Sequence, residues 1–346
     1  MPKISIVMSV FNNEADVGEA IESMLNQSFS EFELIIINDA STDNSAAIIE
    51  KFSQSDDRII VLHNEENLKL AASLNRGIQL ARGAFIARMD ADDVSLPNRL
   101  ETQFEYMQTH ADVAVCGAWV ELYEDSRVVW KTNVTAEKAN CAAFFESCFH
   151  HPTVMIRKTV LDQLGGYDES VQFAQDCHLW SRLAFDHQQV LHNIPQVLLR
   201  YRSHPEKSRD QYRLDQYDKA TELRQKNLRR LHLDATDEAY QWHDILCCAK
   251  TLSRKEQFQS LLTWIDQLES ANRSVGLLSA RAFADELNRK LLGVCLASAE
   301  VTIYAILAYL QRCKGRDFLK NGYRCSRMLF WYLKALLSRP FSEVVK

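Results

Sequence analysis

Three aspartates stand within four positions at the end of a short apolar run, in the order Asp90, Asp92 and Asp93. Side chains alternate on an extended segment, so Asp90 and Asp92 would share one side with their Cα atoms about 7 Å apart. Carboxylates that share a cleft of low dielectric constant raise each other's pKa unless a cation offsets their charge. A divalent metal, Mn²⁺ or Mg²⁺, with coordination positions open to phosphate oxygens is the natural partner. The spacing predicts a metal–diphosphate site; the alternative is a solvated acidic turn.

Strand-like and helix-like segments alternate in front of these carboxylates and would position them. We expect strands at 4–10, 32–38, 59–62 and 85–89, and helices at 14–27, at 68–81 and from Ser41–Thr42 onward. Strand–helix repeats of this length imply parallel strands, right-handed crossovers and helices on both faces of a sheet. In such sheets the ligand lies outside the carboxyl ends of the strands.

Polar side chains follow four consecutive predicted strand ends. They are Asn12 and Glu14, then Asp39, then Asn67 and Asn75, then the three aspartates. Helix capping is an alternative reading for Ser41, Thr42 and Asn67. One cleft with a polar lining of nucleotide size explains these residues jointly.

The order of these motifs resembles glycosyltransferase family 2, whose catalytic domain has the GT-A fold. The motifs are Asn12-Asn13-Glu14, Asp39-Ala40-Ser41-Thr42-Asp43, Asn67 with Asn75-Arg76-Gly77, Asp90-Ala91-Asp92-Asp93, His151-Pro152-Thr153, Gly165-Gly166-Tyr167-Asp168, Gln175-Asp176 and Tyr201-Arg202-Ser203-His204. The resemblance implies an α/β GT-A domain at 1–208, with a mostly parallel central sheet flanked by helices. The periodicity after it is helical and predicts an all-helical region at 209–346.

The resemblance also implies an inverting sugar transfer from a nucleoside diphosphate sugar, with a UDP-sugar favoured. The residues that would contact the donor nucleotide are Val10 through its backbone, Asn12, Glu14, Asp39, Asn67, Asn75 and Asp90. Asp92 and Asp93 would bind the metal. His204 would add a nitrogen ligand, or would be a structural histidine on a closing loop.

Asp176 is the expected general base for the acceptor hydroxyl. It begins an amphipathic segment, and a helix N-terminus helps to keep a carboxylate ionised. The alternative is that Asp176 caps the helix. His151 and Trp180 are expected on the acceptor side, although a lone aromatic such as Trp180 is more often part of the core.

The chain departs from the family pattern at three positions. The family often has Gly where this chain has Ala40 and Lys69, and more often has Glu where it has Gln175. Ala40 indicates that the turn does not require a positive φ. Lys69 would either add a cation near the diphosphate or lie solvated at the surface.

Two other functions fit parts of the pattern. The segment Asp90-Ala91-Asp92-Asp93-Val94 also matches haloacid-dehalogenase-type phosphatases, with Asp90 as nucleophile. That motif normally follows the first strand of its domain, whereas here it follows the fourth. A sugar-nucleotide-binding protein without activity is the third reading, and Gln175 is its only support.

The C-terminal region contains an apolar stretch at 291–310 that is followed by a basic tail at 311–346. Residues 311–346 hold nine Lys or Arg and two Asp or Glu, in a chain whose net charge is −6. This basic, aromatic tail suits an anionic membrane surface or a solvated helix face. The stretch 291–310 is long enough to span a bilayer, but Glu300 favours a buried bundle helix.

The chain has no recognisable signal peptide, and its nine cysteines form no Cys-x-x-Cys pair. We therefore expect a cytoplasmic protein, with a peripheral position on the inner face of the plasma membrane left open. The expected acceptor is a saccharide or a lipid-linked saccharide in surface polysaccharide or lipopolysaccharide synthesis. No nucleic-acid partner is expected.

Overall fold

A computed structural model describes residues 1–203, 210–234, 236–298 and 309 of the chain. The chain divides into two compact units, Met1–Ala220 and Thr221–Lys346. The boundary between them falls inside one helix, α8 (Asp210–Arg230). The domain boundary expected at residue 208 stays a prediction.

The strands are β1 Ile4–Val10, β2 Phe32–Asn38, β3 Ile59–His63, β4 Phe85–Asp90, β5 Val94–Ser95, β6 Val113–Leu122, β7 Val129–Trp130, β8 Met155–Arg157 and β9 Val190–Tyr201. The helices of the first unit are α1 Val17–Leu25, α2 Ser45–Ser53, α3 Lys69–Leu80, α4 Arg99–Thr109, α5 Ala136–Ala143, α6 Lys158–Leu164 and α7 Gln175–Ser181, with short turns η1 His151–Thr153 and η2 Arg182–Asp186. After α8, the second unit has α9 Asp237–Cys248, α10 Lys255–Val275 and α11 Ala280–Ala297.

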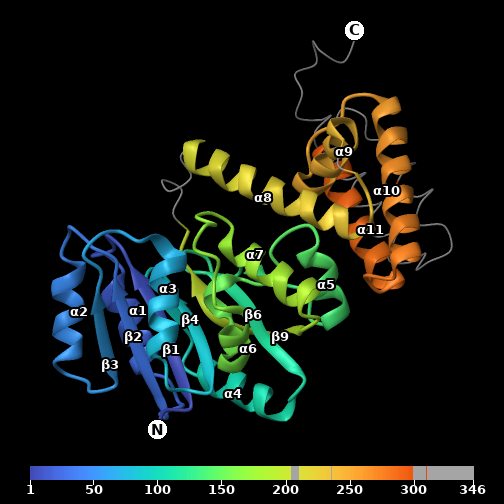
Figure 1. Ribbon diagram of the computed structural model, residues 1–346. Coiled ribbons are helices and arrows are strands. Elements are labelled where there is room, and N and C mark those ends of the chain that lie inside the picture. Colours follow the sequence, from blue (N-terminus) through green and yellow to red (C-terminus); the bar gives the residue numbers. More distant parts are fainter. Residues whose placement is uncertain (204–209, 235, 299–308, 310–346) are drawn as a thin grey trace. The chain divides into compact units, whose positions relative to one another are not determined.

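The strands of the first unit form one sheet in the order β3-β2-β1-β4-β8-β6-β9-β5, with β7 paired to β6 (Figure 1). β1 to β4 are parallel, as predicted. Beyond β4 the sheet is mixed, because β8 runs antiparallel to both β4 and β6, while β9 is parallel to β6. The sequence did not indicate these antiparallel pairings.

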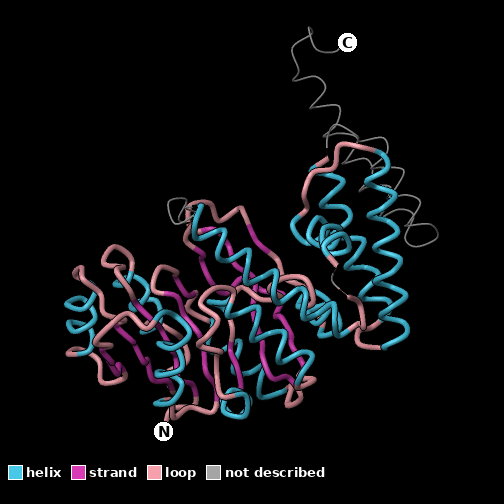
Figure 2. Tube along the Cα trace, turned by 45° about the horizontal axis from the view of Figure 1, so that its top comes forward, coloured by secondary structure: helices cyan, strands magenta, loops and turns pink. Residues whose placement is uncertain are grey.

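Apolar side chains on both faces of the sheet explain its position between helices (Figure 2). Every residue of β2 is buried, as expected for a strand that is covered on both sides. On one face Ile6 and Met8 pack with α1, α2 and α4. On the other face Val7 and Ile37 pack with α3, α5, α6 and α7.

The predicted elements of the first half are present, with shifts at their ends. β1 and β2 have the predicted bounds, while α1 is shorter than the expected 14–27. α2 begins at Ser45 rather than at Ser41–Thr42, because the segment before it forms a loop bonded to the β1–α1 loop. Thr42 N donates to Asn12 Oδ1 at 2.7 Å in that loop.

The helices of the second unit pack around a core of their own. Its buried side chains include Leu261, Trp264, Leu268, Phe283 and Leu287. Among the described residues, no helix combines the length and the apolar character needed to cross a bilayer. Most of the apolar stretch 291–310 beyond α11, and all of the basic tail, lie outside the described residues.

Candidate active site

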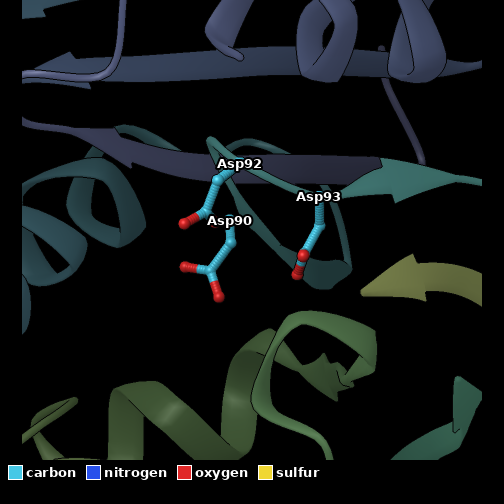
Figure 3. A group of neighbouring side chains, drawn as sticks. All are labelled: Asp90, Asp92 and Asp93. Carbon is cyan, nitrogen blue, oxygen red and sulfur yellow. The ribbon is translucent and has the colours of Figure 1, made fainter. Parts of the chain in front are cut away.

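The three aspartates of the β4 end lie together. Asp90 is the last residue of β4, and Asp92 and Asp93 follow in the turn to β5. One carboxylate oxygen from each lies within 4.8 Å of those of the other two. Figure 3 shows all three side chains on the same side of the chain, with Asp90 and Asp92 next to each other.

Asp93 is the buried member of the cluster. Its side chain is 1% exposed. Oδ1 accepts a hydrogen bond from Arg202 N at 2.9 Å, while Oδ2 has no hydrogen-bond partner among the described residues. Burial and the negative charge of Asp90 raise the pKa of Asp93 to about 8. An oxygen donor set with one buried, unpartnered carboxylate oxygen fits a hard divalent cation, which would offset this repulsion.

Arg88 supplies a cation that the sequence analysis missed. It is buried on β4, two residues before Asp90, and its guanidinium forms an ion pair with the Asp90 carboxylate. Burial alone would lower the pKa of Arg88, but the carboxylates of Asp90 and Asp93 outweigh it and raise the pKa. A lone charged residue in an apolar strand was the signal for this group.

Arg202 fastens the aspartate turn to two other elements. Its Nε donates to Asp92 O at 2.9 Å, and its Nη2 donates to Glu19 of α1 at 2.6 Å. The guanidinium lies over the Tyr123 ring, 3.8 Å from the centroid. Together with the Asp93 contact, these bonds make Arg202 a positioning residue for the cluster; the motif contained it, but no role was predicted.

Asp176, the predicted base, lies half-buried in the first turn of α7. Ser147 Oγ donates to its Oδ2 at 3.0 Å. Burial raises the pKa of the Tyr167 hydroxyl, and the charges of both Asp176 and Asp90 add to that increase.

The two residues predicted on the acceptor side, His151 and Trp180, differ in their exposure to solvent. His151 is half-buried, and its Nε2 is 2.8 Å from the Tyr167 hydroxyl. Burial and the charge of Arg88 hold the pKa of His151 well below its ordinary value, so its ring is neutral at pH 7. Trp180 is 0% exposed in the core, which corrects its assignment to the acceptor side. His204 lies outside the described residues.

The residues expected around the nucleotide also connect the loops at the strand ends. Glu14 Oε2 accepts from Asn44 N at 2.8 Å, which links the loops after β1 and β2. The exposed Asn12 makes the parallel link to Thr42. Their roles as nucleotide contacts stay predictions.

Asp39 lies buried at the end of β2 and holds the loop before α3. Its Oδ1 accepts from Asn64 Nδ2 at 2.6 Å and from Leu68 N at 2.9 Å. Its backbone N donates to Val10 O at 2.8 Å. Asn67 Oδ1 accepts from Lys69 N within that loop. Asp39 and the Val10 carbonyl thus shape this edge of the sheet, and ligand contacts by them or by Asn67 remain predictions.

Asn75 has a different role from the predicted one. Its Nδ2 donates to Tyr167 O at 2.9 Å and to Glu169 Oε1 at 2.8 Å, and its Oδ1 accepts from Tyr167 N at 2.8 Å. Both donors of this buried amide are engaged within the protein. Asn75 therefore positions the loop that carries Tyr167, and it has no donor left for a nucleotide.

Two of the departures from the family pattern carry unusual backbone angles. Ala40 has φ +58° and Lys69 has φ +70°. The prediction that Ala40 marks a turn without positive φ is therefore wrong. At Lys69 the conformation directs the backbone N toward Asp39 Oδ2, at 3.1 Å. This hydrogen bond holds the angle at Lys69 although the residue carries a Cβ.

Solved structures share this architecture. A fragment 1-349 of S. aureus TarS, solved in complex with UDP-GlcNAc, matches with a TM-score of 0.54 and 16% identity, over 96% of this chain and 92% of that chain. A mannosyltransferase from Pyrobaculum calidifontis, solved with GDP-Man and Mn²⁺, matches with a TM-score of 0.51 and 15% identity, over 98% and 88% of the two chains. The fold is that of the GT-A glycosyltransferases.

Sequence relatives give the family. The model for glycosyl transferase family 2 matches residues 5–165. An uncharacterized glycosyltransferase of Methanocaldococcus jannaschii is 36% identical over 208 residues, which cover 58% of this chain and 71% of the relative. The O-antigen biosynthesis glycosyltransferase WbnJ of Escherichia coli is 34% identical over 205 residues, 58% and 80% of the two chains. The chain belongs to glycosyl transferase family 2 and is a glycosyltransferase, so the phosphatase reading of Asp90 is wrong.

Proposed function

We propose that this glycosyltransferase uses a nucleoside diphosphate sugar as its donor and requires a divalent metal. We further propose that the transfer inverts the configuration at the anomeric carbon of the sugar. The observation that carries the proposal is the convergence of three carboxylates at the end of β4, one of them with a buried, unpartnered oxygen. Asp92 and Asp93 would hold the metal, with Asp90 in support. When bound, the cation would offset the negative charge that grows on the departing diphosphate.

The protein's own groups would do the rest of the chemistry. Asp176 would accept the proton of the acceptor hydroxyl as that oxygen attacks the anomeric carbon. The Ser147 hydroxyl fixes one oxygen of Asp176 and leaves the other for the acceptor. Arg88, which precedes the aspartates in the sequence, and Arg202, which follows them, would hold the metal-binding turn in place through their contacts with Asp90 and Asp92.

A UDP-sugar is the donor that we favour. TarS of S. aureus has been solved with UDP and with UDP-GlcNAc, which supports this choice. The Pyrobaculum enzyme was solved with GDP-Man and Mn²⁺, which supports the metal and makes GDP the second candidate. The relative in O-antigen biosynthesis supports a saccharide or lipid-linked acceptor in surface polysaccharide synthesis.

We also propose that the enzyme works at the inner face of the plasma membrane as a peripheral protein. The basic, aromatic tail at 311–346 supports this, because a lipid-linked acceptor would be presented at an anionic surface.

Calorimetric titration with UDP and GDP, in Mn²⁺ and in EDTA, tests the metal site. We expect the parent protein to bind its nucleotide at least tenfold more tightly with Mn²⁺, and Asp92→Asn to lose that difference. Asp57→Asn, an exposed carboxylate beyond α2, is the matched control and should behave as the parent. Equal affinity of the parent in EDTA and Mn²⁺ would refute the metal role.

Nucleotide release from a panel of nucleotide sugars tests catalysis itself. A transferase hydrolyses its donor slowly without an acceptor, whereas a sugar-nucleotide-binding protein without activity does not. If the protein binds a nucleotide sugar but releases no nucleotide, with or without added glycosides, the result would favour a sugar-nucleotide-binding protein without catalytic activity.

A further inference from the structure

The edge of β6 that faces β4 is covered by three successive segments. β8 pairs with Val115 and Cys116 of β6. Next comes η1, where the Thr153 hydroxyl accepts from Ala118 N at 3.1 Å. β7 follows and pairs with Val120 and Glu121. β8 also pairs with the first half of β4, so β7 lies beyond the carboxyl end of β4, where the three aspartates are.

Trp130 projects from this short strand into solvent. Of the five tryptophans in the described part of the chain, it alone is exposed, at 43%. Its ring centroid lies 5.4 Å from that of Tyr201 and 6.2 Å from that of His150. The indole is therefore supported by two rings while part of its apolar surface stays in water, an unfavourable exposure that a ligand would relieve.

The two supporting rings connect Trp130 to both halves of the active site. Tyr201 directly precedes Arg202, whose amide donates to Asp93 Oδ1 at 2.9 Å. Burial and the charges of the three aspartates raise the pKa of Tyr201 to about 12. His150 is three residues from Ser147, which donates to Asp176, and three residues span at most about 11 Å. Trp130 thus packs against two segments, one of which leads to the aspartate cluster through Arg202 and the other to Asp176 through Ser147.

The sheet order decides which substrate reaches this ring. The loops expected to hold the nucleotide follow β1, β2 and β3, which lie on one side of β4, whereas β6 and β7 lie on the other. A donor whose diphosphate sits at the aspartates would extend its nucleoside toward the first side. The space beside Trp130 is then left to the acceptor.

We propose that the exposed face of Trp130 is the acceptor subsite, where the indole stacks against the apolar C–H face of a sugar ring of the acceptor. The proposal rests on the proposed function, because it assumes a sugar donor at the aspartate cluster. A pyranoside suits this position, since its hydroxyl rim stays hydrated while its C–H face covers the indole.

Fluorine NMR of the full-length protein labelled with 5-fluorotryptophan tests binding directly. Trp130→Phe identifies the Trp130 resonance by its loss. Methyl β-glycosides of glucose, galactose, mannose and N-acetylglucosamine are then titrated to millimolar concentration, in the presence of UDP and Mn²⁺. We expect at least one glycoside to shift the Trp130 resonance selectively. No shift by any glycoside, or equal shifts of all tryptophans, would overturn the proposal.

Kinetics separate this subsite from the donor site. With the donor identified by nucleotide release, Trp130→Ala should raise the KM for the glycoside at least tenfold while the donor KM stays within twofold. Trp130→Phe, which keeps a ring face, should stay within threefold of the parent on both. Val128→Ala removes another exposed apolar group of the same hairpin and should match the parent.

The outcomes distinguish the two proposals. An unchanged glycoside KM in Trp130→Ala, or a donor KM that rises in parallel, would overturn the acceptor subsite and leave the donor chemistry standing. If the parent releases no nucleotide from any donor, the proposed function fails. In that case the NMR titration still decides whether Trp130 binds sugars.

Discussion

At the scale of single residues, the site is a balance between three carboxylates and two arginines. Arg88, buried in the sheet, forms an ion pair with Asp90. Arg202 binds the turn at two points, with its backbone N donating to the Asp93 carboxylate and its Nε donating to the backbone carbonyl of Asp92. Asp93 Oδ2 is left without a partner among the described residues. The repulsion that raises the pKa of Asp93 is what a divalent cation bound beside Asp92 and Asp93 would offset.

Asp176→Asn tests the assignment of the general base. The amide keeps the shape of the side chain and can still accept from Ser147, but it cannot take a proton. We expect turnover to fall by about 10² to 10⁴, while nucleotide affinity in Mn²⁺ stays near that of the parent. Steady-state nucleotide release and calorimetry measure the two quantities.

A matched control is Asp162→Asn, an exposed carboxylate on α6 that pairs with Lys158. It should leave turnover unchanged. An Asp176→Asn enzyme that keeps a third or more of parental turnover would show that another group removes the proton.

At the scale of elements, four of the seven non-glycine residues with positive φ in the described part of the chain lie on loops that lead into the site. Asn12, Ala40, Lys69 and Ala174 all have positive φ without being glycine. The first three follow β1, β2 and β3, and the fourth precedes α7. Such conformations cost about 1–3 kcal/mol each and persist only where surrounding bonds impose them. At Asn12 and Lys69 the Thr42–Asn12 and Lys69–Asp39 hydrogen bonds supply that constraint.

Glu33 joins three elements at the opposite end of the sheet. Its carboxylate, buried on β2, accepts from Ser5 of β1 at 2.6 Å and from Arg82 Nε after α3 at 2.8 Å. Burial alone would raise the pKa of Glu33, but these hydrogen bonds outweigh it and lower the pKa below its ordinary 4.5. The ionised carboxylate therefore stabilises the fold above pH 4.5, and this contribution is lost as pH falls through the lowered pKa.

Glu33→Gln should accordingly lower the free energy of unfolding by roughly 2 kcal/mol at pH 7, the scale of hydrogen bonds to a charged group. The difference from the parent should shrink as the pH falls below 4.5. Urea unfolding at several pH values measures it. Glu31→Gln, which removes an exposed ion pair with Lys3, should cost at most about 1 kcal/mol. A Glu33→Gln effect that is equal at pH 7 and pH 4 would contradict the assignment.

At the scale of the whole molecule, charge is unevenly distributed along the chain. Residues 311–346 carry nine basic and two acidic side chains, although the chain as a whole is at −6. The rest of the chain is therefore strongly acidic and would be repelled by anionic lipid. Any attraction must come from the tail, at about 1 kcal/mol for each Lys or Arg near the surface.

We expect the full-length protein to float with vesicles that contain phosphatidylserine at low salt, and to dissociate as ionic strength rises. Deletion of 312–346 should abolish flotation and leave nucleotide binding intact. Replacement of Arg312, Arg316, Arg324 and Arg327 by Gln should weaken flotation while the chain length is retained. Full-length protein that ignores such vesicles at low salt would contradict the peripheral assignment.

What the sequence determined by itself was the local pattern: continuous apolar runs for β1 and β2, helical spacing for α3, and the spacing of the aspartates after β4. Those features depend on neighbours in the chain, and the structure confirms the elements that they predict. The antiparallel insertion of β8 and the placement of β7 depend on contacts between distant segments, which no local periodicity records.

Tertiary structure alone decided which of the predicted site residues are hydrogen-bonded or buried within the protein. Asn75 and Trp180 stand in the motifs expected at the site, yet one is bonded to the Tyr167 loop and the other is enclosed in the core. Ala40 takes a positive φ that its residue type does not indicate. Arg88 is buried beside Asp90, and Trp130 packs against Tyr201 and His150, which are distant in the sequence. The sequence names the residue types, but burial and partners, which set their chemistry, arise only when the chain has folded.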